Sequence, residues 1–287
     1  MKCLGLIGGI GWESTAIYYR LINEEVRNRF GSLHSARLVL NSLEFQAIDS
    51  LVKSNRWNDA GAALADAARM LKRAGADAVV LCSNLMHYVV ESVEAAVAIP
   101  VLHIGDAVLA EARTARVNRI GLIGTRFTLE HDFLLERPAA HAGHRRLPVK
   151  IFAPDPAEFE ELDRIIYGEL CRGVIREESR ATLLRLVRDL RTRGAQGIVL
   201  GSSELALLLK PDDFALPLFD STEIHALAAV RWALGDDAGR RSGFAIAAER
   251  ETMPPAKPAV RKPAKGSRAS VATARSAISL QSKACQY

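Results

Sequence analysis

Short apolar runs alternate with longer segments of helical spacing along most of this chain. Cys3–Ile7 and Ala78–Leu81 are continuous apolar runs, which are typical of strands in a sheet buried on both faces. Tyr18–Arg29 and Asp59–Ala74 carry apolar residues at helical spacing, and Gly75 ends the second of these helices. The alternation predicts parallel sheets whose strands are connected by right-handed helical crossovers.

The same pattern predicts elements over the rest of the chain. Further strands are expected over Arg37–Leu43, Pro100–Ile104, Arg119–Ile123, Val149–Phe152, Gly197–Leu200 and Leu216–Asp220. Further helices are expected over Val89–Val97, Phe127–Leu135, Ala157–Arg172, Arg176–Arg193 and Thr222–Leu234. Strands and helices alternate in both halves, so the predicted fold class is α/β.

The second half of the chain repeats the first at an offset of 119 residues. Gly75–Asn84 (GADAVVLCSN) is echoed by Gly194–Ser203 (GAQGIVLGSS). A repeat this long exceeds the roughly 20–50 residues of a solenoid unit and indicates a duplicated domain. We therefore predict two pseudo-symmetric, three-layer α/β domains with parallel four-stranded sheets, in which Ser83 and Ser202 are equivalent. A site between such halves presents two similar groups to opposite faces of one carbon.

Length and charge divide the chain into two folded parts and a tail. With 287 residues, of which 49% are hydrophobic, the chain can form two domains of ordinary size. We expect an N-terminal domain of residues 1–100 plus 211–235, a second domain of residues 101–210, and a disordered basic tail over 236–287. From Arg240 onward ten Lys and Arg oppose two Glu, whereas the preceding residues hold 28 basic and 31 acidic side chains. Because the positive excess lies in the tail, no nucleic-acid partner is expected for the folded part.

Cysteine usage and hydropathy favour a cytoplasmic protein. The four cysteines, Cys3, Cys82, Cys171 and Cys285, form no CxxC pair and show no disulfide-framework spacing. The N-terminus has one Lys and a short, glycine-broken apolar run, which is typical of a first strand rather than a signal peptide. No apolar stretch approaches the roughly 18 residues of a membrane span, so no membrane association is expected.

Small and polar residues follow several of the predicted strands. In open α/β sheets ligands bind beyond the carboxyl ends of the strands, where Gly8–Gly11, Cys82–Asn84, Gly124–Thr125 and Ser202–Glu204 are expected. The glycine loop lacks the GxGxxG spacing of a dinucleotide site, so a turn whose N–H groups approach a carboxylate is the preferred interpretation. Helix capping is the structural alternative for the hydroxyl segments. Their equivalent positions in the two halves favour one shared site.

Six segments of the chain carry a family resemblance that runs from Met1 to about Leu234. They are Gly5–Thr15 (GLIGGIGWEST), Tyr18–Asn23 (YYRLIN), Ser83–His87 (SNLMH), Gly124–Thr128 (GTRFT), Gly201–Glu204 (GSSE) and Phe219–His225 (FDSTEIH). With these segments the chain resembles the aspartate/glutamate racemase family of cofactor-independent racemases. The resemblance implies an active site at the interface of two α/β domains, a homodimer and no pyridoxal phosphate. It also implies that one thiol removes the α-proton while the opposite thiol reprotonates the other face.

Both catalytic positions depart from the family pattern. The family's first cysteine directly precedes an Asn, and Ser83 stands there; the second, usually in Gly-Cys-Thr-Glu, is replaced by Ser202. Cys82 lies one residue earlier, and the alternation of side chains along a strand points it away from the site. A thiol with an ordinary pKa of about 8.5 can be brought into working range, whereas a serine hydroxyl needs an adjacent base. Relatives with Thr at the first position and Cys at the second indicate that one substitution is tolerated with skewed activity.

Other residues complete the predicted site. Those expected to bind the substrate are Gly11, Asn84, Leu85, Thr125, Ser203 and Glu204. His87 and His225 match family motifs at helix starts, where each either orients a catalytic group or serves as a structural cap. Where the family often has a Lys for the distal carboxylate of the substrate, Glu161 falls here, and the nearby Arg164 could replace it. The remaining histidines show no metal-ligand spacing, so neither a metal nor a cofactor is expected.

These observations lead to three hypotheses on function. The first is a pyridoxal-phosphate-independent racemase of aspartate or glutamate, with Ser83 and Ser202 as the two acid/base groups and a weakened or altered activity. The second is a non-catalytic protein that binds a small dicarboxylate, and the third is a related isomerase or lyase acting on a carboxylic acid. Deuterium exchange at the α-carbon distinguishes them: exchange with inversion supports the first, binding without exchange the second, and new products the third.

Overall fold

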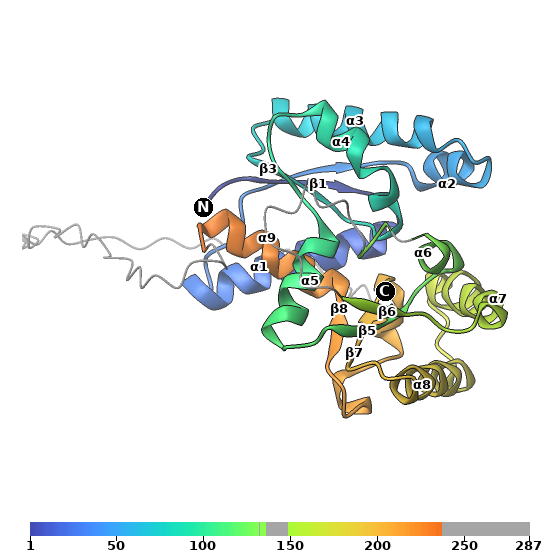
Figure 1. Cartoon of the computed structure of the whole chain (residues 1–287). Helices are drawn as coiled ribbons and strands as arrows, with labels where there is room; N and C mark the ends of the chain where they lie inside the picture. Colours follow the sequence, from blue (N-terminus) through green and yellow to red (C-terminus); the bar gives the residue numbers. More distant parts are fainter. Residues whose placement is uncertain (132, 136–148, 237–287) are drawn as a thin grey trace, which may run out of the picture. The chain divides into compact units, whose positions relative to one another are not determined.

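Two parallel four-stranded sheets form the centre of the protein, described by a computed structural model over residues 1–131, 133–135 and 149–236 (Figure 1). The strand order is β2-β1-β3-β4 in the first sheet and β6-β5-β7-β8 in the second. The first sheet consists of β1 (Leu4–Gly8), β2 (Leu38–Ser42), β3 (Ala78–Leu81) and β4 (Val101–Leu102). The second consists of β5 (Arg119–Ile123), β6 (Lys150–Phe152), β7 (Gly197–Leu200) and β8 (Leu218–Asp220). The predicted α/β class with two pseudo-symmetric parallel four-stranded sheets is confirmed.

The central strands are continuous apolar runs because both faces of each sheet are covered. Every residue of β1, β3 and β7 is buried. β1 lies between β2 and β3, and β5 has the equivalent place between β6 and β7. All strand pairs are parallel, so the carboxyl ends of β1 and β3 share one edge, as do those of β5 and β7. Ligands of α/β proteins bind beyond such edges.

Helices and short turns connect the strands. The α-helices of the described residues are α1 (Trp12–Phe30), α2 (Phe45–Lys53), α3 (Trp57–Arg73), α4 (Val90–Ala96), α5 (Ile104–Thr114), α6 (Arg126–Glu130), α7 (Phe159–Asp163), α8 (Glu177–Thr192) and α9 (Ser221–Leu234). The 3₁₀ turns are η1 (Leu85–Val89), η2 (Pro156–Glu158), η4 (Leu170–Arg172), η5 (Ser203–Leu207) and η6 (Pro211–Asp213), and η3 (Arg164–Glu169) is a π-helical turn. None of the described helices combines the length and the apolar character needed to cross a membrane.

The first sheet is enclosed by helices from both ends of the described chain. On one face, Leu64 of α3 shares an apolar core with Leu81 of β3. On the other face, Ile22 of α1 and Ala229 of α9 share a core with Leu6 of β1. Because α9 follows the second sheet in the chain but packs on the first, the two halves are interlocked rather than joined by one linker (Figure 1).

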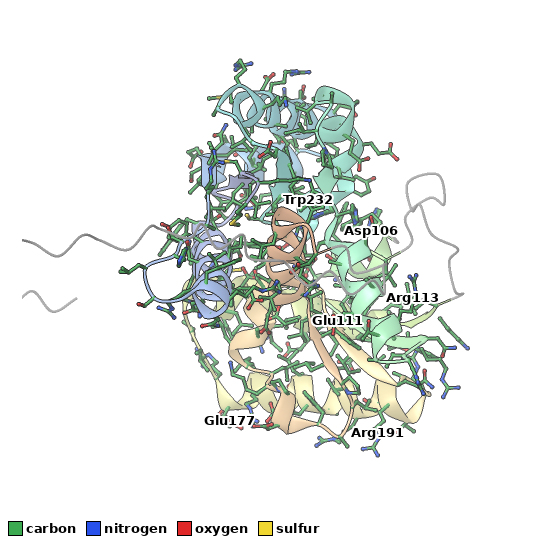
Figure 2. The ribbon with its side chains drawn as sticks, turned by 90° about the vertical axis from the view of Figure 1, so that its left-hand side faces the viewer. Asp106, Glu111, Arg113, Glu177, Arg191 and Trp232 are labelled. Atoms are coloured by element: carbon green, nitrogen blue, oxygen red, sulfur yellow. The ribbon has the colours of Figure 1, made fainter. Side chains whose placement is uncertain are left out.

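The second sheet has the same layered arrangement. On one face, Leu190 of α8 packs with Ile198 of β7. On the other face, Val108 of α5 packs with Ile120 and Val199. α5 and α9 lie against each other between the two sheets, as seen in Figure 2, where Trp232 labels α9 and Asp106 labels α5. Each half is therefore a three-layer α/β unit, and both sheets belong to one compact unit.

The strand pairing moves both predicted domain boundaries. Residues 101–102 are expected in the second domain, but β4 pairs with β3 of the first sheet. Residues 211–235 are expected in the N-terminal domain, and β8 within them pairs with β7 of the second sheet. Only the helical part of that segment, α9, packs on the first sheet. The predicted tail over 236–287 lies outside the described residues except for Asp236.

Two of the helices were not predicted from the sequence, and one helix that was predicted is irregular. α2 was not predicted, and α5 begins directly after the short strand β4 where only a strand was expected. The buried residues of α5 include Ile104, Ala107, Val108 and Ala112, a helical spacing that could have revealed it. The helix predicted over Ala157–Arg172 is a succession of 3₁₀, α, π and 3₁₀ turns. π turns often occur at functional sites.

Candidate functional site

Ser83 and Ser202 stand at equivalent ends of the two sheets. Ser83 lies two residues beyond Leu81, the last residue of β3, and Ser202 lies two residues beyond Leu200, the last residue of β7. β3 and β7 hold the same place in their sheets. Ser83 is half-buried and Ser202 is buried, with 7% of its surface exposed. The structure thus gives the two predicted acid/base residues matching positions.

The thiol beside Ser83 points into the protein interior. Cys82 is fully buried, in the core that α1 and α9 form with the first sheet. Burial raises the pKa of this thiol and so disfavours its nucleophilic thiolate form. Ser83, and not Cys82, therefore occupies the strand-end position.

A chain of hydrogen bonds through Ser221 joins the strand ends of the two sheets. Ser221, the first residue of α9, donates its hydroxyl proton to the Leu200 carbonyl at the end of β7 over 2.5 Å. The same hydroxyl oxygen lies 3.0 Å from Oδ1 of Asn84, the residue after Ser83. Both side chains are buried. The segment that follows β3 of the first sheet therefore meets the end of β7 of the second sheet, the arrangement needed for a site shared by two halves.

A second chain of hydrogen bonds runs from the start of α1 to the segment after β7. Ser14 Oγ lies 2.6 Å from Ser203 Oγ and 3.5 Å from Glu204 Oε1. The Ser202 hydroxyl donates to Glu204 Oε2 over 2.5 Å. The structure therefore brings together Ser202, Ser203 and Glu204, three of the predicted site residues. Ser14, which was not predicted, connects them to the first half of the chain.

The glycine loop after β1 sets the position of Ser14. Gly9 has a φ of +83°, and a Cβ at this residue would lie only 2.1 Å from the Leu43 carbonyl oxygen, so no larger residue fits. The Gly9 N–H donates to Thr15 Oγ1 over 2.9 Å and ties the loop to the first turn of α1. Gly11 immediately precedes α1 and offers no side chain to cap it. The first N–H groups of α1 are therefore suitable donors for an anionic ligand.

Thr125 lies near Tyr167, a residue of the π-helical turn η3. Thr125 caps α6 by accepting a hydrogen bond from the Thr128 N–H over 3.3 Å. Its side chain also lies close enough to Tyr167 of η3 to act on the pKa of that tyrosine, which it lowers. Although the residue as a whole is exposed, burial of its hydroxyl, followed by the Asp163 carboxylate, raises the pKa of Tyr167 to about 12, and Glu204 is near enough to contribute. Tyr167 thus places a neutral hydroxyl close to both Thr125 and Glu204.

Cys171 brings a thiol near the same carboxylate. It lies on η4, one turn after Tyr167. Although the residue as a whole is exposed, burial of the thiol and the carboxylates of Glu204 and Glu13 raise its pKa to about 12. No sequence signal marked Tyr167 or Cys171, because both lie inside a predicted helix rather than at a strand end. Ser14 and Ser221, by contrast, belong to segments that carry the family resemblance.

His87 and His225 have both ring nitrogens engaged within the protein. His87 Nδ1 donates to the Ser83 carbonyl over 2.8 Å, and its Nε2 accepts from the Ile104 N–H over 3.2 Å. His225 Nε2 lies 2.8 Å from the Leu102 carbonyl oxygen, and its Nδ1 lies 2.7 Å from the Tyr18 hydroxyl. Burial lowers the pKa of His225 to about 4, so its imidazole is neutral at pH 7. These contacts hold both imidazoles in fixed positions, and that of His87 is attached to the backbone of Ser83.

Arg164 was expected to replace the lysine that binds the distal carboxylate of the substrate, but it is paired with carboxylates of the protein itself. Arg164 makes two hydrogen bonds of 2.7 Å to the Glu161 carboxylate and also pairs with the buried Glu169. Glu169 further accepts a hydrogen bond from Ser179 over 2.5 Å. Both carboxylates raise the pKa of Arg164. An Arg held by two carboxylates presents little net charge to a substrate, so this structure argues against Arg164 as the anchor.

The remaining predicted residue, Leu85, begins η1 and packs partly against the core of the first sheet.

One surface hollow, of about 320 Å³, lies elsewhere, between the segment 154–158 and α8, with Asp155 and Arg193 in its lining. It shares no residue with the groups at the strand ends. Among the described residues, no cluster of His, Cys, Asp and Glu is suited to hold a metal ion.

Known proteins resemble this chain in sequence and in fold. The family model described as Asp/Glu/hydantoin racemase matches residues 7–229. A protein from Yersinia pestis provisionally named an Asp/Glu racemase is 43% identical, with a TM-score of 0.75 over 82% of this chain and 100% of that one. An aspartate racemase homologue from Pyrococcus horikoshii OT3 is 32% identical, with a TM-score of 0.70 and the same coverage. An aspartate racemase from Picrophilus torridus shares the fold at 16% identity and a TM-score of 0.62, over 81% of this chain and 94% of that one.

Proposed function

The chain belongs to the Asp/Glu/hydantoin racemase family, and on this basis we propose that it moves the α-proton of a small acidic amino acid. In this proposal it interconverts the L and D forms of aspartate or glutamate without pyridoxal phosphate. Ser83 and Ser202 hold the two acid/base positions, one on each side of the α-carbon.

One observation carries the proposal: Ser221 contacts the strand ends that hold both serines and so connects them. Asn84, next to Ser83, contacts Ser221, and Ser221 contacts the carbonyl of Leu200, two residues before Ser202. In this proposal, a small acid binds at this junction with its α-carbon between the two serines. This is the requirement of a reaction in which a proton leaves one face of a carbon and returns to the other.

The same residues suggest how the substrate is held. The N–H groups at the start of α1, beyond Gly11, and the amide of Asn84 suit the α-carboxylate. Thr125 and Ser203 offer hydroxyls for the ammonium group or the second carboxylate. Leu85 provides apolar contact near the first strand end. With Arg164 paired to Glu161 and Glu169, the distal carboxylate depends on hydroxyl and N–H donors.

We propose that the activity is weak, because a hydroxyl is a much poorer acid and base than a thiol. A thiol has an ordinary pKa of about 8.5, whereas serine acts as a base only with help from a neighbouring group. The expected rates are therefore far below those of a two-thiol site.

The test is deuterium incorporation at the α-carbon of L- and D-aspartate and L- and D-glutamate in D₂O, followed by NMR and chiral chromatography. The variant S83C/S202C restores both thiols, and S83A/S202A is the matched control with neither group. We expect slow exchange in the unaltered protein, at least about 100-fold faster exchange with inversion in S83C/S202C, and none in S83A/S202A. A folded S83C/S202C variant that binds these acids without racemising them would contradict the proposal.

The replacement of both family thiols by hydroxyls favours one second candidate, a non-catalytic protein that binds a small dicarboxylate. For such a protein, calorimetry would detect binding of aspartate, glutamate or a dicarboxylate while NMR detects no exchange. Appearance of a new product in the same NMR experiment would instead indicate a related isomerase or lyase.

We also propose a cytoplasmic homodimer in which α1 contributes to the interface. Trp12, Tyr19 and Phe30 are exposed and lie on one face of α1, within about 20° of each other at 100° per residue. Light scattering after gel filtration tests this: a dimer is expected for the unaltered protein and a monomer for W12E/Y19E. Unchanged mass in that variant would exclude α1 from the interface.

A further inference from the structure

We infer that Glu204 accepts the hydroxyl proton of Ser202 when Ser202 removes the α-proton of the substrate. This pair makes proton removal faster on the face of the α-carbon that points to Ser202 than on the opposite face. The inference rests on the proposed function, since it concerns the same site. It assigns Glu204, so far considered a substrate-binding residue, to the proton path itself.

The geometry of the carboxylate supports this role. Ser202 donates its hydroxyl proton to Glu204 Oε2 over 2.5 Å, a short charge-assisted hydrogen bond. The other oxygen, Oε1, lies 3.5 Å from Ser14 Oγ, which is held in turn by Ser203 at 2.6 Å. Hydroxyls from both halves of the chain therefore orient one carboxylate toward Ser202. A serine hydroxyl bonded in this way to a base has the arrangement of an activated nucleophile or proton carrier.

Four other acidic and basic groups near the strand ends are already held by partners within the protein. Both ring nitrogens of His87 and of His225 have partners within the protein. Asp220 caps α9 by accepting from two backbone N–H groups, and Asp163 accepts from the Arg126 N–H. Among the described residues, Glu204 is the carboxylate that is hydrogen-bonded to a predicted acid/base serine.

The proton path conserves protons and charge at each step. Ser202 Oγ takes the α-proton of the bound amino acid while its own hydroxyl proton moves to Glu204 Oε2. The electron pair of the broken C–H bond stays on the substrate and delocalises into its carboxylate. Glu204 then exchanges its proton with solvent, and a deuteron returns through Ser202 to the same face of the carbon. The result is exchange with retention of configuration.

The first half of the chain lacks an equivalent pair. Within the described residues, the Ser83 hydroxyl has no hydrogen bond to a carboxylate or an imidazole, and the contact to His87 uses its backbone carbonyl. Each enantiomer directs its α-hydrogen to a different side of the site. The enantiomer whose hydrogen faces Ser202 is therefore expected to exchange at least about 10-fold faster than the other, with slow inversion.

Four variants test the pair: E204Q, E204D, S202C and S202C/E204Q, with E13Q as the matched control for the other carboxylate near Cys171. Gln keeps the size and hydrogen-bonding capacity of Glu but cannot accept the proton as a carboxylate does. We expect E204Q to lower the exchange rate of the faster enantiomer at least about 100-fold, E204D to keep part of it, and E13Q to keep it within about threefold. Circular dichroism and calorimetric binding of aspartate verify that E204Q folds and binds.

The thiol variants separate a role in proton transfer from a structural one. A thiol can ionise by itself, so its exchange rate is expected to rise with pH up to about pH 8.5 and to depend much less on Glu204. S202C/E204Q should therefore lose less than about tenfold relative to S202C, whereas E204Q loses about 100-fold relative to the unaltered protein. Equal losses in both backgrounds would assign Glu204 a structural role and overturn the inference.

The outcomes also separate this inference from the proposed function. Exchange at the unaltered rate in E204Q, or equal exchange of both enantiomers, overturns the inference and leaves the proposed function standing. No exchange in the unaltered protein and none in S83C/S202C overturns both.

Discussion

Ser14 and Ser203 are hydrogen-bonded through their side-chain oxygens at 2.6 Å, although 189 residues separate them in the chain. Ser14 lies in the first turn of α1, which follows the glycine loop of the first sheet, and Ser203 begins η5 beyond β7 of the second. Ser14 is buried, with 5% of its surface exposed. This contact holds the two halves together at the candidate site.

Removing this contact is expected to cost stability in a way that depends on both partners. We predict that S14A and S203A each lower the free energy of unfolding by about 1 kcal/mol, with a coupling of about 0.5–1.5 kcal/mol in the double variant. Urea unfolding of the four proteins measures this cycle. Strictly additive losses would show that the two hydroxyls do not stabilise each other.

His225 is expected to make stability depend on pH between about 6.5 and 4. Its pKa is lowered to about 4 by burial, from an ordinary value near 6.5, so the unfolded chain binds more protons than the folded chain in this interval. Stability contributed by neutral His225 is present above about pH 6.5 and is lost as the pH falls toward 4, by about 3 kcal/mol in total.

Comparison with H225Q isolates this contribution, because Gln is neutral throughout and can still hydrogen-bond the Tyr18 hydroxyl and the Leu102 carbonyl. Unfolding free energies measured from pH 8 to pH 4 should fall more steeply for the unaltered protein than for H225Q. Parallel curves would mean that His225 titrates alike in the folded and unfolded states.

Cys171 is expected to react slowly with alkylating reagents despite its exposure. Burial of the thiol, with Glu204 and Glu13, raises its pKa to about 12, so little thiolate exists at pH 8. In a C285S background, where Cys3 and Cys82 are buried, we predict alkylation by iodoacetamide at least about 100-fold slower than that of a free cysteine. Peptide mass spectrometry locates the modified residue.

Glu204 should influence that reaction from its place near Cys171. E204Q removes a negative charge that raises the thiol pKa, so its alkylation rate at pH 8 is expected to increase a few-fold. E13Q provides the parallel measurement for the second carboxylate. A rate unaffected by either substitution would place both carboxylates too far from the thiol to matter.

Gly9 and Gly75 offer a matched pair for the role of the glycine loop. Both have positive φ, +83° and +93°, but a Cβ at Gly9 would lie 2.1 Å from the Leu43 carbonyl oxygen, whereas nothing lies within 4 Å at Gly75. We predict that G75A costs about 1–2 kcal/mol of stability through backbone strain alone. G9A should cost about 3 kcal/mol or more, because the backbone itself must move. Equal costs, measured by denaturant unfolding, would show that the loop adapts easily.

Local pattern determined the class and most elements of this protein. Continuous apolar runs such as Ala78–Leu81 and Gly197–Leu200 are strands with the bounds predicted, because a strand buried on both faces excludes polar residues at every position. The internal repeat also located Ser83 and Ser202 at matching strand ends. Where burial or a strand end determines the type of residue, the pattern can be recognised from a few neighbouring residues in the sequence.

Only the tertiary structure decided how the halves meet and which groups touch. The sequence assigned all of residues 211–235 to the N-terminal domain, whereas only α9 packs on the first sheet and β8, directly before it, pairs with the second. The contacts of Ser14 with Glu204 and of Asn84 with Ser221 join residues more than 130 positions apart. The pairing of Arg164 and the inward contacts of His225 likewise depend on neighbours from other elements. Proton chemistry at this site is set by such distant partners, because a side chain's acidity and reach depend on what surrounds it rather than on its place in the sequence.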